Sequence, residues 1–182
     1  MLMNKERSLL MILDVQERST PATENPREVI TGCSRLLAVA KELGIPYFLT
    51  RQTPDALGDT IIDLRQAAGT EALVFDKASF SAYRNEEIRR HLEKSGRKQI
   101  ILAGIETHIG VTQTALDLKA AGYETFMVSN ACSSRDPIQN ILALQRLISN
   151  GVDAVTSEMV FFEWLEKAEG EAFQKIADQY AF

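Results

Sequence analysis

The chain has 182 residues, of which 45% are hydrophobic and 25% are charged, a composition typical of one soluble globular domain. Its formal net charge of -5, with no basic run or stripe, argues against a nucleic-acid partner. No apolar run is long enough for a membrane span or a secretion signal, and Cys33 and Cys132 lack the spacing of a metal site, so we expect a cytoplasmic protein.

Short apolar runs alternate with amphipathic stretches along the whole chain. The apolar runs predict strands over 9–14, 45–50, 72–77, 99–104, 123–130 and 152–157. Helical spacing, together with glycine, proline and cap signals, predicts helices over 25–44, 85–96, about 110–122 and 136–151, and further helical segments over 161–168 and 171–182. Residues 51–60 have the composition of a loop.

This alternation predicts the fold class. Strands separated by helices form a parallel sheet, because parallel neighbours need a crossover that a helix supplies. The strands are continuously rather than alternately apolar, which indicates that both faces of the sheet are covered. We therefore predict a single α/β domain over residues 1–182, with three α/β/α layers around a six-stranded, mainly parallel, Rossmann-like sheet.

Two charged residues stand where such a sheet binds ligands, which is outside the carboxyl ends of its strands. Asp14 ends the first predicted strand and Lys77 ends the third, so a carboxylate and an amine could meet over the edge of the sheet. Taken alone, either residue is more often a loop residue or half of a structural ion pair. The pattern by itself therefore leaves a structural and a catalytic interpretation open.

Six segments carry a resemblance to a known family. They are LLMILDVQ, YFLTRQTPDALGDT, VFDKASFSAY, ILAGIETHIGVTQTALDL, VSNACSSR and AVTSEMVFFEWL, and together they span almost the whole chain. In this order they resemble the isochorismatase-like hydrolases, a superfamily that also holds nicotinamidases and N-carbamoyl amidohydrolases. The segments ACSSR and TSEMVFFEWL are most similar to the smaller, single-domain branch of that superfamily.

The resemblance implies a catalytic Asp-Lys-Cys triad with one member replaced. Asp14 and Lys77 match the first two members, but Gly110 stands at the position of the nucleophilic cysteine. Isochorismatases proper also carry glycine there, and they hydrolyse a vinyl ether without a covalent intermediate. The resemblance further implies a cis peptide bond between Ile105 and Glu106.

Asp14 has two possible roles in such a site. As a carboxylate it could draw a proton from water, and as an acid it could protonate the substrate. Lys77 beside it would lower the pKa of Asp14 and favour the base, whereas a dianionic substrate would favour the acid. Arg51, Arg84 and Arg135 are possible cationic clamps for such a substrate. The residues that we expect to bind the substrate are Gln16, Arg51, Phe80, Ile105, Glu106 and Thr107.

Several other reactive residues are assigned structural roles. His108 is expected to pack or to form a hydrogen bond, His91 to lie on a solvated helix face, and Cys132 to be a small turn residue. Metal-binding relatives carry an Asp-x-His pattern after the second strand, whereas residues 51–60 contain no histidine. We therefore expect neither a metal nor another cofactor.

Three hypotheses about function remain. The first is a hydrolase that cleaves a vinyl-ether or C–N bond of a small molecule through Asp14 and Lys77, without a covalent thiol step. The second is a non-catalytic descendant that only binds a small molecule, and the third is a cysteine amidohydrolase whose nucleophile was replaced by Gly110. We also expect a homodimer or larger homo-oligomer, because the apolar VFFEWL run exceeds what one amphipathic helix buries.

Overall fold

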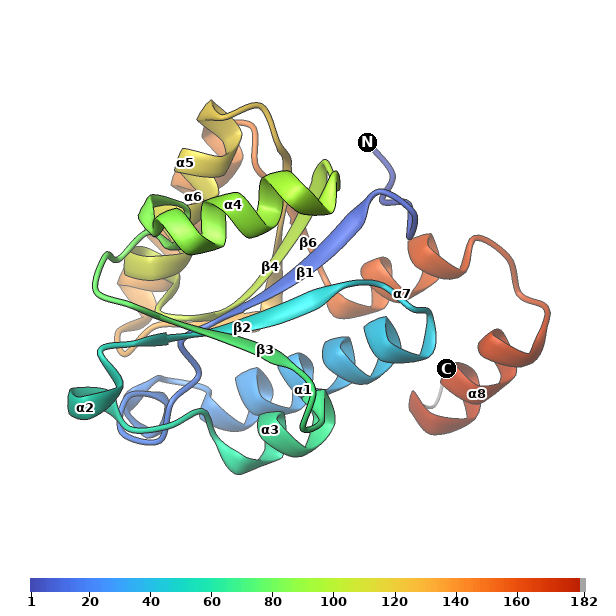
Figure 1. Cartoon of the computed structure of the whole chain (residues 1–182), viewed down its shortest axis with the longest axis horizontal. Helices are drawn as coiled ribbons and strands as arrows, with labels where there is room; N and C mark the ends of the chain where they lie inside the picture. The colour runs from blue at the N-terminus through green and yellow to red at the C-terminus, as the bar shows by residue number, and fades with distance from the viewer. Residues whose placement is uncertain (181–182) are drawn as a thin grey trace.

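The computed structural model describes residues 1–180 and forms a six-stranded parallel sheet with helices on both faces (Figure 1). The strands are β1 (Ser8–Leu13), β2 (Tyr47–Gln52), β3 (Leu73–Lys77), β4 (Gln99–Ile105), β5 (Glu124–Ser133) and β6 (Asp153–Val155). Their order across the sheet is β3-β2-β1-β4-β5-β6, and every neighbouring pair is parallel. The predicted fold class is confirmed, and the sheet is wholly rather than mainly parallel.

The helices divide between the two faces of the sheet. One face is covered by α1 (Pro26–Glu42), α3 (Ile62–Ala68), α7 (Ser157–Leu165) and α8 (Glu171–Tyr180), and the other by α4 (Glu86–Ser95), α5 (Thr112–Ala120) and α6 (Pro137–Ser149). Shorter pieces are α2 (Pro54–Leu57), two 3-10 turns, η1 (Thr20–Ala22) and η2 (Ala82–Arg84), and a π-helical turn, η3 (Thr107–Val111).

Successive side chains of β1 point to opposite faces of the sheet, so this one strand contributes to the core on both sides. Leu10 and Ile12 point to the α1 side, whereas Leu9, Met11 and Leu13 point to the side of α4 and α5. All five side chains are at most 1% exposed, because helices cover both faces. This burial on both sides is why the strand is continuously apolar in sequence.

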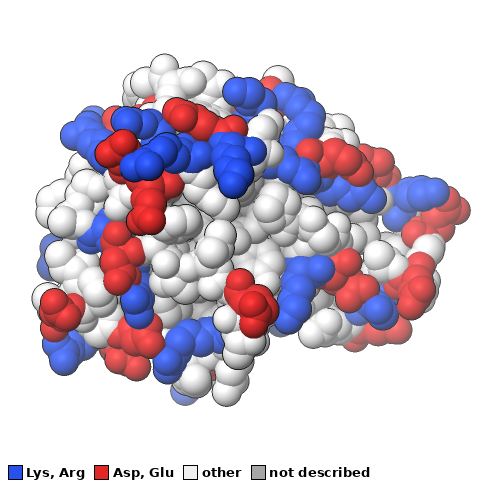
Figure 2. Space-filling view, viewed as in Figure 1, with Lys and Arg blue, Asp and Glu red and all other residues white. Residues whose placement is uncertain are grey.

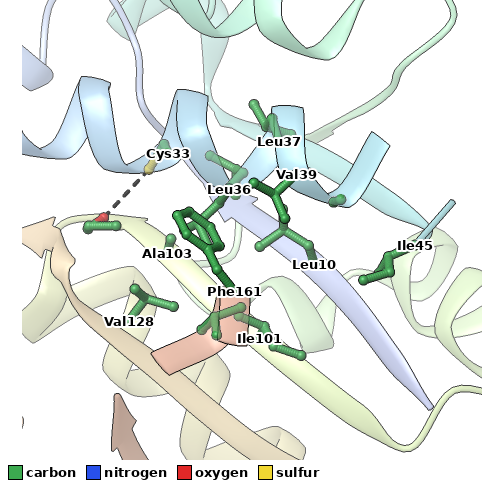
Figure 3. Close-up of a cluster of buried hydrophobic side chains, with 14 of the residues drawn as sticks. Leu10, Cys33, Leu36, Leu37, Val39, Ile45, Ile101, Ala103, Val128 and Phe161 are labelled. Atoms are coloured by element: carbon green, nitrogen blue, oxygen red, sulfur yellow. Dashed lines mark hydrogen bonds between the residues drawn. The ribbon is translucent and has the colours of Figure 1, made fainter. Parts of the chain in front are cut away.

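The apolar stripe of α1 supplies much of one core. Cys33, Leu36 and Leu37 lie on the face of the helix toward the sheet, where Phe161 of α7 packs against the same cluster (Figure 3). The Cys33 thiol donates a hydrogen bond of 3.5 Å to the carbonyl of Ala131. Burial raises the pKa of this thiol well above its ordinary value, so Cys33 is a packing residue.

The structure corrects the interpretation of residues 51–60 and of the third strand. Residues 51 and 52 belong to β2, and α2 lies within the predicted loop; α3 follows it and was not predicted, since its seven residues are too short for a clear helical period. The third strand is an edge strand, with Leu73 49% and Val74 42% exposed. An apolar run therefore does not prove that both faces of a strand are covered.

The expectations for Cys132 and His91 were also wrong. Both residues are covered by side chains that are distant in the sequence. Cys132 lies inside β5 rather than in a turn, and burial raises the pKa of its thiol to about 12. His91 is half-buried, with its ring 5.3 Å from Phe48 and 5.4 Å from Phe75, so it does not lie on a solvated face. Burial, with a smaller effect of Lys94, lowers the pKa of His91.

The C-terminal part of the chain closes the α1 side of the sheet. Trp164 of α7 is fully buried, and its indole N–H donates to the Ser8 hydroxyl at 3.0 Å. The helix predicted over 171–182 is observed as α8 up to residue 180, and residues 181 and 182 lie outside the described part of the chain. Within residues 1–180, no helix has the length and apolar character needed to cross a membrane.

Candidate functional site

Asp14 and Lys77 meet at the carboxyl ends of two strands of the sheet that are separated by one strand. Asp14 follows the last residue of β1, Lys77 is the last residue of β3, and β2 lies between these strands. The Lys77 ammonium donates to Asp14 Oδ2 at 2.6 Å, and the two side chains are 0% and 9% exposed. Thr50 of β2 donates its hydroxyl to Asp14 Oδ1 at 2.7 Å. The sheet order therefore brings together two residues that are 63 positions apart.

The buried ammonium of Lys77 has several further acceptors. It donates to Gln52 Oε1 at 2.7 Å and to the backbone carbonyls of Ser79 and Phe80 at 3.2 and 3.3 Å. A buried charge is tolerated only when its hydrogen-bonding groups are satisfied and an opposite charge is near. The turn that follows β3 thus holds the Lys77 side chain in place beside the Asp14 carboxylate.

Burial has the largest effect on the pKa of Asp14. Desolvation raises the pKa of this carboxyl above its ordinary value, whereas the charge of Lys77 and the hydrogen bonds from Lys77 and Thr50 lower it, and the net shift is upward. This outcome differs from the expectation that Lys77 would dominate. A carboxyl of this kind can hold a proton at a higher pH than an exposed aspartate, so it can exchange a proton with a bound molecule.

Gly110 faces this carboxyl from the π-helical turn η3, which precedes α5. A Cβ atom on Gly110 would lie 3.3 Å from Asp14 Oδ2, with the carbonyl oxygens of Ile105 and Phe80 at 3.5 and 3.6 Å. A side chain at position 110 would therefore point at the acid. The peptide bond between Ile105 and Glu106 is cis, as the resemblance implies.

These residues border a cavity of about 350 Å³, at the lower end of the range for small-molecule sites. Its apolar wall is formed by Ala22, Leu57, Phe80, Ile105 and Ile109. Its polar lining is formed by Asp14, Arg18, Ser19, Gln52, Glu106 and Arg135, with Gly110 beside them. The cavity thus offers two carboxylic side chains, an apolar wall and two arginines.

Of the nine residues expected at the site, Asp14, Phe80, Ile105, Glu106 and Gly110 line the cavity, and Lys77 lies in contact with Asp14. The other three have different surroundings. Gln16 is buried, and its amide group bonds to the backbone of Gln52 and Gly58, which fixes the segment after β2. Thr107 is buried and is not among the residues that line the cavity.

Arg51 and Arg84 are engaged by carboxylates outside the cavity. Arg51 binds Asp76 through Nε and Nη2 at 2.7 and 3.1 Å, and Asp59 through Nη1 at 2.8 Å. Arg84 binds Asp117 through Nε and Nη2 at 2.7 and 3.2 Å. Neither guanidinium belongs to the described lining of the cavity, so both act as partners of protein carboxylates.

Arg135 and Glu106 form a pair at the edge of the cavity. The Arg135 side chain lies 3.5 Å from Glu106 Oε2, and the backbone N–H of Arg135 donates to the same oxygen at 2.9 Å. His108, as expected, makes a hydrogen bond, with its Nδ1 2.9 Å from the Ser134 hydroxyl. The segment 133–135 is thereby joined to the turn that carries Gly110.

Arg18 lines the cavity but was not predicted to do so. Its signal in the sequence is weak, because it lies four residues beyond Asp14 in DVQER, past the expected end of the strand. The segment after β1 turns back toward β2, where Gln16 pairs with Thr60, and this brings Arg18 to the rim. Among residues 1–180, no group of three or more His, Cys, Asp or Glu side chains could hold a metal ion.

Known proteins share both this sequence pattern and this fold. Residues 8–159 match the isochorismatase domain family. Isochorismatase domain-containing protein 1 of Salmo salar is 36% identical over 163 residues, which are 90% of this chain but only 57% of that protein. The chain thus spans little more than half of that relative.

Solved structures agree with the fold. MAR1 ribonuclease of Caenorhabditis elegans superposes with a TM-score of 0.92 at 29% identity, over 98% of this chain and 91% of that one. The YcaC gene product of Escherichia coli, described as an octameric hydrolase of unknown specificity, also gives a TM-score of 0.92, at 20% identity over 99% of this chain and 91% of that one. The latter likeness is one of fold alone.

The ion pair predicts how stability depends on pH when the lysine is removed. Lys77→Met leaves the Asp14 carboxylate buried without its ammonium, so we expect the free energy of unfolding to fall by about 3–5 kcal/mol near pH 8. Loss of the lysine raises the already high pKa of Asp14 further. A group with a raised pKa in the folded state stabilises the fold at low pH, and this stabilisation is lost as the pH rises through that pKa.

The deficit should therefore be smaller at about pH 5 than at about pH 8, as measured by urea unfolding at both values. The double variant that adds Asp14→Asn removes the titrating group and is the matched control. It should show little of this pH dependence. A deficit in Lys77→Met that is equal at both pH values would contradict the assignment.

Proposed function

The chain belongs to the isochorismatase domain family, and from this premise we propose that it is a hydrolase that cleaves a small molecule in the cavity above Asp14. The observation that carries the proposal is the buried Asp14 carboxyl, with its raised pKa, held by Lys77 and facing the open position at Gly110. We propose that the cleaved bond is a vinyl ether or a C–N bond and that no covalent intermediate forms.

Asp14 is the proposed acid of this reaction. Its raised pKa favours the protonated carboxyl, which can give a proton to the vinyl carbon or to the leaving group. A water molecule then adds to the activated carbon, and its proton returns to the Asp14 carboxylate. Lys77 stabilises that carboxylate between these two transfers from 2.6 Å away. The adduct then collapses as its C–O or C–N bond breaks. The leaving group departs with a proton, which comes from the adduct hydroxyl in a vinyl ether or from the earlier transfer by Asp14 in a C–N substrate. One water is consumed, and Asp14 ends protonated as it began.

The cysteines support a mechanism without a thiol. None of the described residues that line the cavity is a cysteine. Cys33 and Cys132 are free but buried, and burial raises the pKa of both thiols, that of Cys132 to about 12. Thiols of this kind are poor nucleophiles at neutral pH. Free thiols also fit the reducing cytoplasm that we expected.

Hydrolysis is favoured over the two alternatives, a binding protein without activity and a cysteine enzyme that has lost its thiol. Lys77 and Asp14 keep a complete set of buried partners. A site that only bound an apolar molecule would be equally stable without a buried ion pair, because apolar replacements of such pairs are often neutral or stabilising. The intact pair therefore supports a chemical role.

A small substrate is also favoured over RNA, although the Caenorhabditis elegans relative is described as a ribonuclease. Figure 2 shows acidic and basic side chains intermixed over one face of the molecule, without the basic stripe that usually binds phosphates. The cavity of about 350 Å³ has room for a small molecule rather than for a strand.

Replacement of the proposed acid tests the function directly. Asp14→Asn should lower kcat by about 10²–10⁴-fold, because a positioned proton donor contributes that much. The measurement is turnover on a panel of small vinyl ethers, amides and esters. The variant should stay folded by circular dichroism, since Lys77 keeps its bonds to Gln52, Ser79 and Phe80. Unchanged kcat would make Asp14 a structural residue only.

A thiol placed at position 110 separates the non-covalent mechanism from a lost cysteine. Gly110→Cys puts the sulfur beside Asp14 and close to Lys77, so iodoacetamide should modify it at least about tenfold faster than Cys33 or Cys132. If the parent is active and the variant loses activity, the non-covalent mechanism is supported. If only the variant cleaves amides, the chain is better explained as a cysteine hydrolase without its thiol.

A homo-oligomer is also proposed, but on a surface different from the one first expected. Val160, Phe161 and Trp164 of the VFFEWL run are buried within the chain. The exposed aliphatic side chains gather on α6 instead, where Ile138, Ile141, Leu142 and Ile148 are 52, 49, 53 and 53% exposed. A helix whose outer face carries such a stripe usually contacts another protein surface.

Light scattering at micromolar concentration should give the mass of a dimer or a larger assembly. Ile141→Glu on α6 should shift the mass toward a monomer, because a charge is costly in an apolar interface. Ile62→Glu on α3 is the matched control, since Ile62 is also 52% exposed but lies on the opposite face of the sheet. A monomeric parent protein would refute the oligomer.

A further inference from the structure

We propose that Arg18 selects substrates that carry a single carboxylate, which it binds at the rim of the cavity through its Nε and Nη2 groups. This inference deepens the proposed function. That the bound molecule is a substrate rests on the proposed hydrolysis. The inference does not require knowledge of which bond is cleaved.

Arg18 is anchored on one side only. Its Nη1 group donates to the carbonyl of Ala56 at 2.8 Å and, more weakly, to that of Asp55 at 3.4 Å, at the end of α2. Its Nε and Nη2 groups make no hydrogen bond to any described residue, and no carboxylate of residues 1–180 forms an ion pair with it. The guanidinium is thus oriented by the protein while one edge with two donors stays open.

Two other arginines show what this open edge binds. Arg51 holds the Asp76 carboxylate through Nε and Nη2, and Arg84 holds the Asp117 carboxylate through the same pair of groups. In both cases two parallel N–H groups meet the two carboxylate oxygens, which is the planar geometry that suits arginine. Arg18 lines the cavity and has the same pair of groups without a partner among the described residues, so a carboxylate could still be supplied by a ligand.

The other charges that border the cavity are already paired. Asp14 is neutralised by Lys77 at 2.6 Å, and Glu106 is neutralised by Arg135 at 3.5 Å. Arg18 is the one charged residue of the described lining without a counterion. One unpaired cation favours one anionic group on the ligand, since a second anion would find no free partner among the lining residues.

The remaining lining describes the rest of the ligand. Leu57, Phe80, Ile105 and Ile109 form an apolar wall between the rim and the acid. A ligand with a small apolar body could lie on this wall, with its carboxylate on Arg18 and its reactive bond toward Asp14. The cavity of about 350 Å³ limits such a body to roughly the size of one ring with short substituents.

A second hollow offers a control for unspecific attraction. It has a volume of about 280 Å³ and is lined by residues that include Arg27 and Arg35 on α1. Both arginines are exposed and form no ion pair with the described residues. Arg35 instead lies 5.6 Å from the ring of Tyr180. An anion attracted only by exposed arginines would bind here as readily as at Arg18.

The test compares benzoate with benzamide, two probes of nearly the same shape of which only benzoate is anionic. Binding is measured by isothermal titration to the full chain at neutral pH, for the parent protein, Arg18→Gln, Arg18→Lys and Arg27→Gln. We expect the parent and Arg27→Gln to bind benzoate about tenfold or more tightly than benzamide, because bonds to a charged partner are strong.

Arg18→Gln should reduce this ratio to near one, and Arg18→Lys should keep part of it, since lysine retains the charge but not the two-donor edge. Melting curves verify that each variant is folded. Equal binding of the two probes by the parent, or an unchanged ratio in Arg18→Gln, would overturn the inference. A ratio lost in Arg27→Gln would place the anion in the second hollow and overturn it as well.

Turnover separates this inference from the proposed hydrolysis. An inactive protein that prefers benzoate through Arg18 would support the inference and refute the hydrolase. An active protein that binds both probes equally would support the hydrolase and refute the inference. The two proposals can therefore fail independently.

Discussion

The buried ion pair of Asp14 and Lys77 is the interaction on which the site depends. Two charged side chains that are 9% and 0% exposed are stable only if each finds enough partners. Those partners come from three adjacent strands and the turn after the third, with Thr50 and Gln52 on β2 between the pair. The strand ends must therefore keep their register for the pair to form, so the site and the sheet are parts of one structure.

The pair also decides what the cavity can do. Burial raises the pKa of Asp14 while the charge of Lys77 lowers it, so this carboxyl keeps its proton to a higher pH than an exposed aspartate does. Gly110 leaves the space in front of that acid open, and Glu106 and Arg135 cancel each other beside it. What remains for recognition is the apolar wall and the guanidinium of Arg18. The proposed acid, Asp14, and the proposed carboxylate-binding residue, Arg18, thus border the same cavity.

Local sequence patterns were sufficient for most of the fold and for the centre of the site. Apolar runs predicted six strands to within a few residues, because most side chains of the central strands are buried under helices on both faces of the sheet. The rule that ligands bind outside the carboxyl ends of parallel strands pointed to Asp14 and Lys77, and the structure confirms that their side chains meet; their catalytic role stays a proposal. The short helix α3 lacks such a signal, since seven residues give no clear helical period. The third strand was predicted, but its exposure follows from its place at the edge of the sheet.

The sequence by itself thus determined the α/β alternation, the residues at the strand ends and the glycine at position 110. Only the tertiary structure decided which charges are free. Arg51 and Arg84 lie near strand ends and were candidates to bind a ligand. In the structure they bind Asp76 and Asp117 instead, which are 25 and 33 positions away along the chain. Arg18 had no distinctive signal, but it is the arginine left without a counterion beside the cavity. The physical reason is that long charged side chains form ion pairs between different helices, strands and turns. Such pairs join residues far apart in the chain, so they produce no periodic pattern in the sequence.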